Sequence, residues 1–185
     1  NFREFRAVAE RLQIPMFNII YADRNGHIAL VFGGQVPVRT KGDATFWSRP
    51  VAGDSSELLW SKIHSFADLP KAIDPPSGWA QNSNDVPWHM TEPMLNSATY
   101  PAYMSPPTGQ IAINFREQRG IWMLREDDKI SFDELLAYKH STHSEVADHV
   151  LDDLIAAAAQ YGNESGKRAA EVLRAWDRAS ESESR

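Results

Sequence analysis

The stretch Met16-Phe-Asn-Ile-Ile-Tyr-Ala-Asp23, then Arg24-Asn25-Gly26, then the apolar run at residues 27–32, decides the fold of this chain. An Asn-Gly pair between two apolar runs is the strongest short-range signal for a β-hairpin. The stretch therefore predicts two antiparallel strands joined by a tight turn. Gly33-Gly34 ends the second strand, and Pro37 limits further pairing because proline has no backbone N–H to donate.

Helices are predicted on both sides of this hairpin. Apolar residues recur at the spacing of one helical face over residues 2–12, and Pro15 ends that helix. A short helix is predicted at residues 116–124, with Ile121 and Leu124 on one side. A helix that leads into an antiparallel hairpin, with further helices collected towards the C-terminus, is typical of the α+β class.

Three more helices are predicted in the C-terminal part. Ser131, with Glu134 three positions later, is the signature of a capping box and begins the first of them. The second is ended by Gly162, and the last runs over residues 165–176. The second carries an apolar stripe that we expect to be buried, namely Val146, Val150, Leu151, Leu154, Ile155 and Ala158.

The segment between the hairpin and these helices has weaker signals. Residues 69–73 are compatible with one helical turn, because nearby prolines forbid long regular elements. Residues 78–81 are predicted to begin as a buried strand that breaks into a polar turn. Residues 89–110 hold four prolines and little periodicity, which predicts a long loop. Loops of this length inside compact domains are commonly functional.

Composition bounds the classes of function. The chain has 185 residues, 42% of them hydrophobic, which is enough for one domain with a core. Its 19 basic and 25 acidic residues give a net charge of −6, which argues against a nucleic-acid partner because that would need a basic face. The absence of cysteine excludes a disulfide framework and a thiol nucleophile. No apolar run approaches the roughly 18 residues of a membrane span, and the charged opening does not resemble a signal peptide.

The most informative polar cluster is Gly78-Trp-Ala-Gln-Asn-Ser-Asn-Asp-Val-Pro-Trp88, in which two tryptophans bracket Gln81, Asn82 and Asn84. Two interpretations are open. Asn and Asp bond their own backbone and tolerate left-handed conformations, so the cluster can be a turn. A fixed side-chain amide can also be aimed at developing negative charge, so the cluster can be an oxyanion hole.

Four segments, in this order, resemble the penicillin acylase family, which includes acyl-homoserine-lactone acylases, aculeacin-type acylases and cephalosporin acylases. The hairpin carries its Asn-x-x-Tyr-Ala-Asp-x-x-Gly-x-Ile pattern from Asn18 onward, followed by Arg39. A Gly-aromatic-x-x-Asn-x-Asn segment begins at Gly78, Arg116 opens a helix, and a capped helix begins at Ser131. Together the four segments span nearly the whole chain.

The resemblance implies the N-terminal-nucleophile hydrolase fold, a four-layer αββα sandwich that matures by autocatalytic cleavage of a precursor. In that family the freed N-terminal Ser of the β chain attacks an amide. Its own α-amino group, with a pKa of about 8, serves as the base. A backbone N–H and an Asn side chain hold the tetrahedral oxyanion. The expected activity is therefore hydrolysis of an N-acyl amide, with no cofactor required for catalysis.

The resemblance also implies roles for five residues of this chain. Asn84, the second Asn of the Asn-x-Asn pair, is the expected oxyanion donor, and Asn82 helps to shape the turn. Arg116 is expected to orient the α-amino group and Asn84, and to face the same cleft. Trp79 and Trp88, together with Asn82, are expected to contact the substrate.

No metal is expected at the catalytic site. His140, His143 and His149 match no familiar ligand spacing, and we interpret them as residues at a helix break. The resemblance is compatible with a structural Ca²⁺, for which Asp23 and Asp43 would be hard oxygen ligands. Solvated loop carboxylates are the simpler interpretation of both.

Asn1 has no nucleophilic oxygen or sulfur, so we expect an internal fragment of the acylase β chain, with the nucleophilic Ser outside it. We expect a helix, the hairpin and an active-site strand over residues 1–88, a loop over 89–113, a helical part over 114–178 and a frayed tail over 179–185. The implied partners are the α chain and the rest of the β chain, in a periplasmic or secreted enzyme.

The substrate class is open between N-acyl-homoserine lactones and β-lactam antibiotics. The tract Tyr138-Lys-His-Ser-Thr142 resembles the lactone-acylase branch, which favours an aliphatic acyl group. The alternative function is a non-enzymatic ligand- or carbohydrate-binding module that uses Trp47, Trp60, Trp79 and Trp88 as an aromatic platform.

Overall fold

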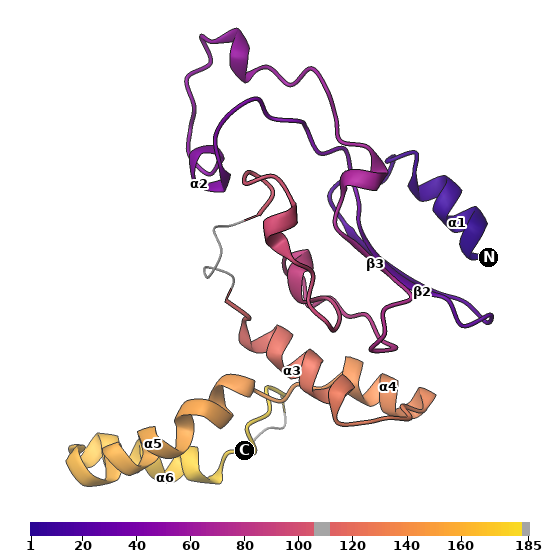
Figure 1. Cartoon of the computed structure of the whole chain (residues 1–185). Coiled ribbons are helices and arrows are strands. Elements are labelled where there is room, and N and C mark those ends of the chain that lie inside the picture. The colour runs from indigo at the N-terminus through magenta and orange to yellow at the C-terminus, as the bar shows by residue number, and fades with distance from the viewer. Residues whose placement is uncertain (106–111, 183–185) are drawn as a thin grey trace. The chain divides into compact units, whose positions relative to one another are not determined.

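The computed structural model of the chain describes residues 1–105 and 112–182. They form two compact units, Asn1–Ile113 and Asn114–Arg185 (Figure 1). The first unit contains a small antiparallel sheet and the second is helical, so the α+β class is confirmed. No helix in the described part of the chain is long and apolar enough to cross a membrane.

The predicted hairpin is present. Strands β1 (Asn18–Ala22) and β2 (Ile28–Phe32) pair antiparallel, with Ile20 opposite Leu30. The Asp23 carboxylate shapes the turn by accepting hydrogen bonds from the backbone N–H of Asn25, at 2.8 Å, and of His27, at 3.2 Å. The turn also places Gly26 at φ 89°, a left-handed conformation that glycine adopts without steric cost.

A third strand occupies the other edge of β2. Strand β3 (Lys71–Ile73) pairs antiparallel with β2, so the prediction of a helical turn at residues 69–73 is wrong. The open edge of β2 offers backbone groups that must be paired, and this decides the local conformation. The Phe32 N–H donates to the Pro70 carbonyl at 2.9 Å, and the Asp74 N–H donates to the Ile28 carbonyl at 2.8 Å.

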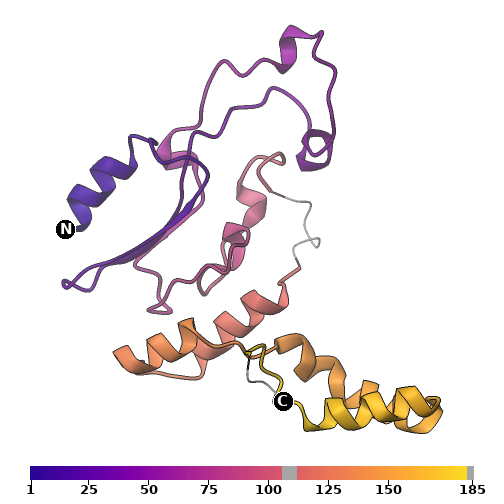
Figure 2. The same cartoon turned by 180° about the vertical axis from the view of Figure 1, so that it is seen from behind.

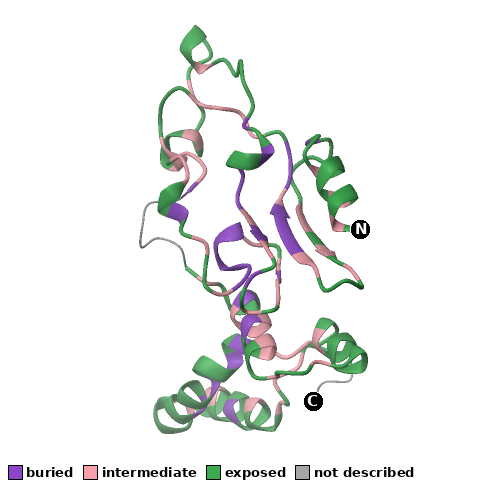
Figure 3. Cartoon of the chain, turned by 45° about the vertical axis from the view of Figure 1, so that its right-hand side comes forward, coloured by how far each residue is buried: buried purple, intermediate pink, exposed green. Residues whose placement is uncertain are grey.

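The core of the first unit is built around β2, whose residues 29–31 are all buried (Figure 3). Leu12, Val31, Phe66 and Leu69 form one cluster. Leu30, Ala72 and Met90 form a second. The central strand is therefore apolar on both faces, which is typical of a strand covered on both sides.

Helix α1 (Phe2–Ala9) is shorter than the predicted helix over residues 2–12. Leu12 has φ 53°, which ends helical geometry and turns its side chain into the core. At the far end of β2, Gly34 has φ 117°, and an added Cβ would meet the Met16 backbone nitrogen at 2.7 Å. Glycine is required there because the two chain segments approach so closely.

Much of the first unit is irregular (Figure 1). It contains the one-turn helix α2 (Ala44–Trp47) and the 3₁₀ turns η1 (Ser56–Leu58), η2 (Phe66–Asp68), η3 (Pro87–His89) and η4 (Ser97–Thr99). The predicted strand at residues 78–81 is not formed. Its hydrogen bonds go elsewhere: the Gln81 N–H donates to the Met90 carbonyl at 2.9 Å, and the Thr91 hydroxyl donates to the Trp79 carbonyl at 2.9 Å.

The second unit consists of α3 (Phe115–Arg125), α4 (Phe132–Lys139), α5 (Glu145–Tyr161) and α6 (Glu164–Ala175). The predicted capping box is confirmed: the Ser131 N–H donates to the Glu134 carboxylate at 2.8 Å, and the Glu134 N–H donates to the Ser131 hydroxyl at 3.3 Å. Helices α5 and α6 lie side by side (Figures 1 and 2). Their shared core consists of Ala147, Leu151, Ile155 and Ala170.

The predicted apolar stripe of α5 is only partly buried. Leu151 is 5% exposed, whereas Val150 is 50% exposed and Leu154 is 52% exposed. The periodic set covers more than one face of the helix, and α6 packs on the face that carries the small residue Ala147. Within the tail predicted to be frayed from residue 179, the Ser180 N–H donates to the Thr142 carbonyl at 3.0 Å. Residues 183–185 lie outside the described residues.

Candidate functional site

The polar turn at residues 82–85 is built by side-chain amides. The Asn82 amide donates through Nδ2 to the Asp85 carbonyl at 3.1 Å and accepts through Oδ1 from the Asn84 N–H at 3.1 Å. Asn84 has φ 65°, a left-handed conformation that Asn tolerates better than most residues. Both interpretations of the cluster therefore stay compatible, because Asn82 forms the turn and Asn84 is displayed by it.

The turn is anchored to the hairpin through Asn18, the first residue of β1. Its Nδ2 donates to the Asp85 carbonyl at 3.0 Å, so this single carbonyl accepts from two carboxamides. A carbonyl cannot donate, which fixes the orientation of the Asn18 amide. The Asn84 side chain is exposed, and no residue in the described part of the chain shares a hydrogen bond with its amide group.

A cavity of about 530 Å³ adjoins this turn and lies within the first unit. Its polar lining comes from β1, from the polar turn and from two loops, and consists of Asn18, Arg39, Asn84, Asp85 and Tyr103. Its apolar lining is larger and consists of Met16, Phe32, Val36, Pro70, Val86, Pro87 and Met104. A mostly apolar pocket with a few convergent polar groups is the usual form of a small-molecule site.

Tyr103 is held at the cavity by a buried histidine. The Tyr103 hydroxyl and His64 Nε2 are 2.7 Å apart, and His64 Nδ1 is 3.8 Å from the Asp68 carboxylate. Hydrogen bonds from the Ser65 hydroxyl and backbone N–H hold the pKa of the Asp68 carboxyl below its ordinary value. These contacts with His64 and Asp68 fix the position of the Tyr103 phenol, which favours a binding role for the phenol oxygen.

Arg39 supplies the cationic group of the lining. Its guanidinium carbon lies 4.3 Å from the centre of the Trp47 ring and 5.5 Å from the centre of the Trp60 ring. Sequence reasoning assigned no site role to Asn18, Arg39 or Tyr103. Asn18 and Arg39 belong to the family-like segment of the hairpin, which was a usable signal, but Tyr103 gave none.

The predicted substrate residues do not line this cavity. Trp88 is 1% exposed and packs against Tyr100, with ring centres 5.3 Å apart. Trp79 is half-buried, and the side chain of Asn82 is used within the turn. The burial of Trp88 also contradicts a surface platform made of all four tryptophans. Two of the four are neighbours, since the ring centres of Trp47 and Trp60 lie 6.5 Å apart.

Arg116 lies in the first turn of α3, in the second unit, and is exposed. That it faces the same cleft as Asn84 stays a prediction.

Within the described residues, no group of three or more His, Asp or Glu side chains is arranged to hold a metal ion. Both Asp23 carboxylate oxygens are used locally, since Oδ2 also accepts from the Tyr21 hydroxyl at 2.8 Å. Asp43 caps α2 by accepting from the Phe46 N–H at 2.8 Å. His143 lies 2.5 Å from the Asp148 carboxylate, in agreement with its interpretation as a structural residue at a helix break.

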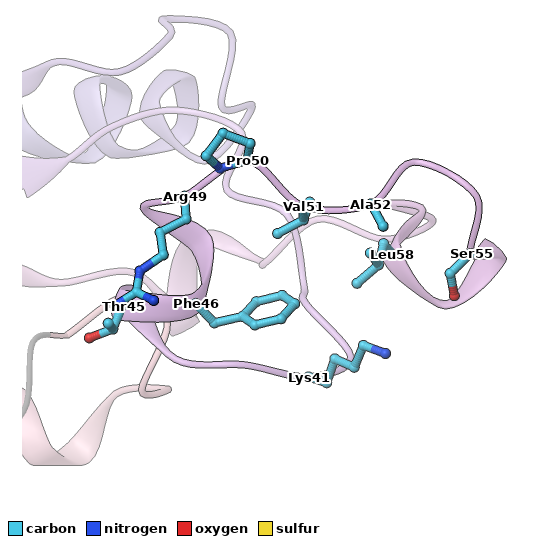
Figure 4. A pocket seen from close by; sticks show the side chains of 9 residues that line it. All are labelled: Lys41, Thr45, Phe46, Arg49, Pro50, Val51, Ala52, Ser55 and Leu58. Atoms are coloured by element: carbon cyan, nitrogen blue, oxygen red, sulfur yellow. The ribbon is translucent and has the colours of Figure 1, made fainter.

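A second cavity, of about 450 Å³, is formed by residues 41–58 alone. The Phe46 ring extends into it from α2, and Lys41 and Arg49 contribute cationic groups (Figure 4). The Lys41 ammonium is paired with the Glu57 carboxylate at 2.8 Å. This cavity contains none of the residues predicted for catalysis or substrate binding.

Comparison with known proteins agrees with the predicted resemblance. The chain is similar to a solved structure of a thermostable penicillin G acylase from Alcaligenes faecalis, with 25% sequence identity and a TM-score of 0.62. The match covers 99% of this chain and 31% of that chain, so this chain spans about a third of the length of that protein. The penicillin amidase family model matches residues 1–185. The chain therefore belongs to the penicillin amidase family.

Proposed function

We propose that this chain is part of an amidohydrolase that cleaves a linear N-acyl amide, and that Asn84 donates a hydrogen bond to the oxyanion. The observation that carries the proposal is the placement of Asn84. A left-handed turn displays its amide, without an internal partner among the described residues, on a mostly apolar cavity. Membership of the penicillin amidase family supports the acylase class.

The proposed mechanism divides the work between this chain and the rest of the enzyme. An N-terminal Ser outside this chain attacks the substrate carbonyl, and its α-amino group takes the hydroxyl proton. The carbonyl oxygen becomes an anion, towards which Asn84 Nδ2–H donates together with a backbone N–H from elsewhere. Arg116 orients the α-amino group and Asn84. The acyl group would lie against the apolar lining, for example Phe32, Val36 and Met104.

The proposal extends to the whole protein. The chain would combine with an α chain and the rest of the β chain in an αββα enzyme located in the periplasm or secreted. The substrate would be an N-acyl-homoserine lactone or a β-lactam antibiotic, and the apolar lining supports an aliphatic acyl group. A structural Ca²⁺ would lie outside the catalytic site.

The test is mutation of the full-length, processed enzyme. An oxyanion donor acts mainly as charge develops, so Asn84→Ala should lower kcat while KM is nearly unchanged. The expected loss in kcat is on the order of 10²–10³-fold. Asn82→Ala should cost less, because Asn82 acts through the turn. Arg116→Lys should also lower kcat, since an ammonium cannot reproduce a planar fork of donors.

Two controls make the result interpretable. Asn25→Ala changes an equivalent side chain in the hairpin turn, away from the cavity, and should leave kcat unchanged. Maturation of each variant must be followed on a gel, because an unprocessed precursor would also be inactive. An Asn84→Ala enzyme that matures and keeps kcat within about threefold, under ~1 kcal/mol, would show that Asn84 is only a turn residue.

The 185-residue chain alone should show no amidase activity, because it spans only about a third of the length of the penicillin G acylase that it resembles. Turnover of an N-acyl amide by the purified chain that is abolished by Asn84→Ala would contradict this. The alternative of a four-tryptophan binding module is not favoured, because Trp88 is buried.

A further inference from the structure

The Arg39 guanidinium is positioned by aromatic faces, which leave its N–H donors uncovered. It lies over Trp47 and Trp60, and the Trp47 indole is itself fixed by donating to the Lys41 carbonyl at 2.8 Å. Within residues 1–105 and 112–182, no residue accepts a hydrogen bond from this guanidinium. Cation–π contacts use the faces of the planar group and leave its N–H donors, which lie in its plane, available.

Arg39 offers the cavity a group that can bind a ligand, whereas Asn18 does not. The Asn18 amide is not available to a ligand, because its Nδ2 is bound to the Asp85 carbonyl and its Oδ1 is buried. Asn18 and Arg39 both line the cavity that Asn84 lines.

The charges of the lining restrict the class of ligand. Among the described lining residues, Arg39 is the only cation and Asp85 the only carboxylate. A guanidinium fork fits both carboxylate and phosphate. The negative charge of Asp85 disfavours a dianion in the same cavity, so a carboxylate is preferred over a phosphate.

We propose that Arg39 binds a carboxylate of the substrate. The site would make the enzyme selective for N-acyl compounds with a free carboxylate, such as a β-lactam antibiotic or an N-acyl amino acid, over neutral compounds such as an ester or an N-acyl-homoserine lactone. This inference rests on the proposed function, and adds a specificity-determining residue to it. Arg39 acts on substrate binding, whereas Asn84 acts on the rate of the chemical step.

The experiment compares N-octanoylglycine with its methyl ester as substrates of the full-length, processed enzyme. Hydrogen bonds to charged groups are among the stronger ones, so Arg39→Met should raise KM for the acid roughly 10- to 100-fold. KM for the ester should change by less than about twofold, which is within the spread of ordinary surface substitutions. Arg49→Met is the matched control, because Arg49 lines the other cavity, and it should change neither value.

Equal effects of Arg39→Met on acid and ester, or no effect on either, would overturn the proposal. Both results would mean that the guanidinium is structural or is paired with a carboxylate of another segment of the enzyme. If Arg39→Met does not mature, Arg39→Lys replaces it. Lys keeps the positive charge but lacks the planar pair of N–H donors of the guanidinium. A rise in KM for the acid alone supports the proposal, and equal changes in KM for acid and ester overturn it.

A binding measurement separates this inference from the proposed function. If the enzyme hydrolyses an N-acyl-homoserine lactone or a β-lactam antibiotic but neither of these two compounds, calorimetric binding of N-octanoylglycine still tests Arg39. At least tenfold weaker binding to Arg39→Met than to the parent enzyme would support the carboxylate site. Equal binding to both would overturn it.

Discussion

The backbone polar groups are paired in different ways in the two units of the molecule. In the helical unit most helix ends are closed by residues one turn away, such as Asn163, which accepts from the Gly166 N–H at 2.9 Å. Distant backbone groups also pair there, as in the Ser180 N–H, which donates to the Thr142 carbonyl. In the first unit the pairing depends on side chains distant in sequence, such as Asn18, which reaches the Asp85 carbonyl. The unit whose backbone is paired by distant side chains is the one that contains the cavity with Asn84.

Lys71 shows how strongly the irregular unit relies on single side chains. Its ammonium donates to the backbone carbonyls of Phe66, Ala67 and Leu69 at 3.0, 2.8 and 2.9 Å. Burial lowers the pKa of Lys71, so the three carbonyls stabilise a charge that is partly removed from water. Irregular backbone can thus be made rigid enough to place polar groups at a cavity, at the cost of dependence on a few residues.

The largest loss of stability should follow from removing a buried side chain of the first unit. Trp88→Ala should lower the free energy of unfolding by about 3–5 kcal/mol, because a buried Trp leaves a large cavity. Chemical denaturation of the chain measures the loss, with Trp88→Phe as the milder control. A loss below about 1 kcal/mol would mean that Trp88 is not part of the core.

A smaller loss is expected in the helical unit. Leu151→Ala should cost about 2–3 kcal/mol, towards the lower end for leucine, because the core between α5 and α6 is small. Val150→Ala, one position away on the exposed side, should change stability by less than about 0.5 kcal/mol. Denaturant midpoints of the two variants test which face of α5 is buried, and equal losses would contradict the assignment.

A still smaller loss of stability is expected at the start of helix α6, where a single side chain caps the helix. Asn163→Ala removes the side-chain acceptor at the start of α6 and should cost about 1 kcal/mol. Asn163→Asp keeps an acceptor at the same place and should retain most of the stability. Thermal unfolding of the three proteins would rank them, and an Asp variant as unstable as the Ala variant would rule out capping as the cause.

The smallest effect concerns the His27–Asp74 pair, whose His27 Nδ1 and Asp74 carboxylate lie 2.9 Å apart near the hairpin turn. The hydrogen bond with Asp74 raises the pKa of His27 above 6.5, and the hydrogen bond with His27 lowers the pKa of Asp74 below 3.8. The Asp23 carboxylate also raises the pKa of His27. Stability from His27 is lost as pH rises through its raised pKa, and stability from Asp74 is lost as pH falls through its lowered pKa.

The pair should therefore contribute most between about pH 4 and pH 6.5. Melting temperatures of the parent and of Asp74→Asn, measured from pH 3 to pH 9, should differ most in that window and converge at higher pH. A difference that stays constant with pH would assign the loss to the Ile28 N–H, which donates to Asp74 at 3.0 Å, and not to the ion pair.

These contrasts explain what could be predicted from the sequence. The hairpin turn and the Ser131 capping box depend on neighbours within a few positions, so their residue types were sufficient. Strand β3 was missed because its partner β2 lies about 40 positions earlier. The cavity brings Asn18 together with Asp85 and Tyr103, and pairings across such separations leave no periodic trace in the sequence.

The left-handed backbone at Asn84 limits which residues selection can place there. At φ 65° the backbone accepts Gly, Asn and Asp far more readily than other types. Gly would offer no donor, and Asp would present a negative charge to an oxyanion. If every residue were tried at this position, a screen for folded protein should be enriched in these three amino acids, and a screen for catalysis should return Asn alone.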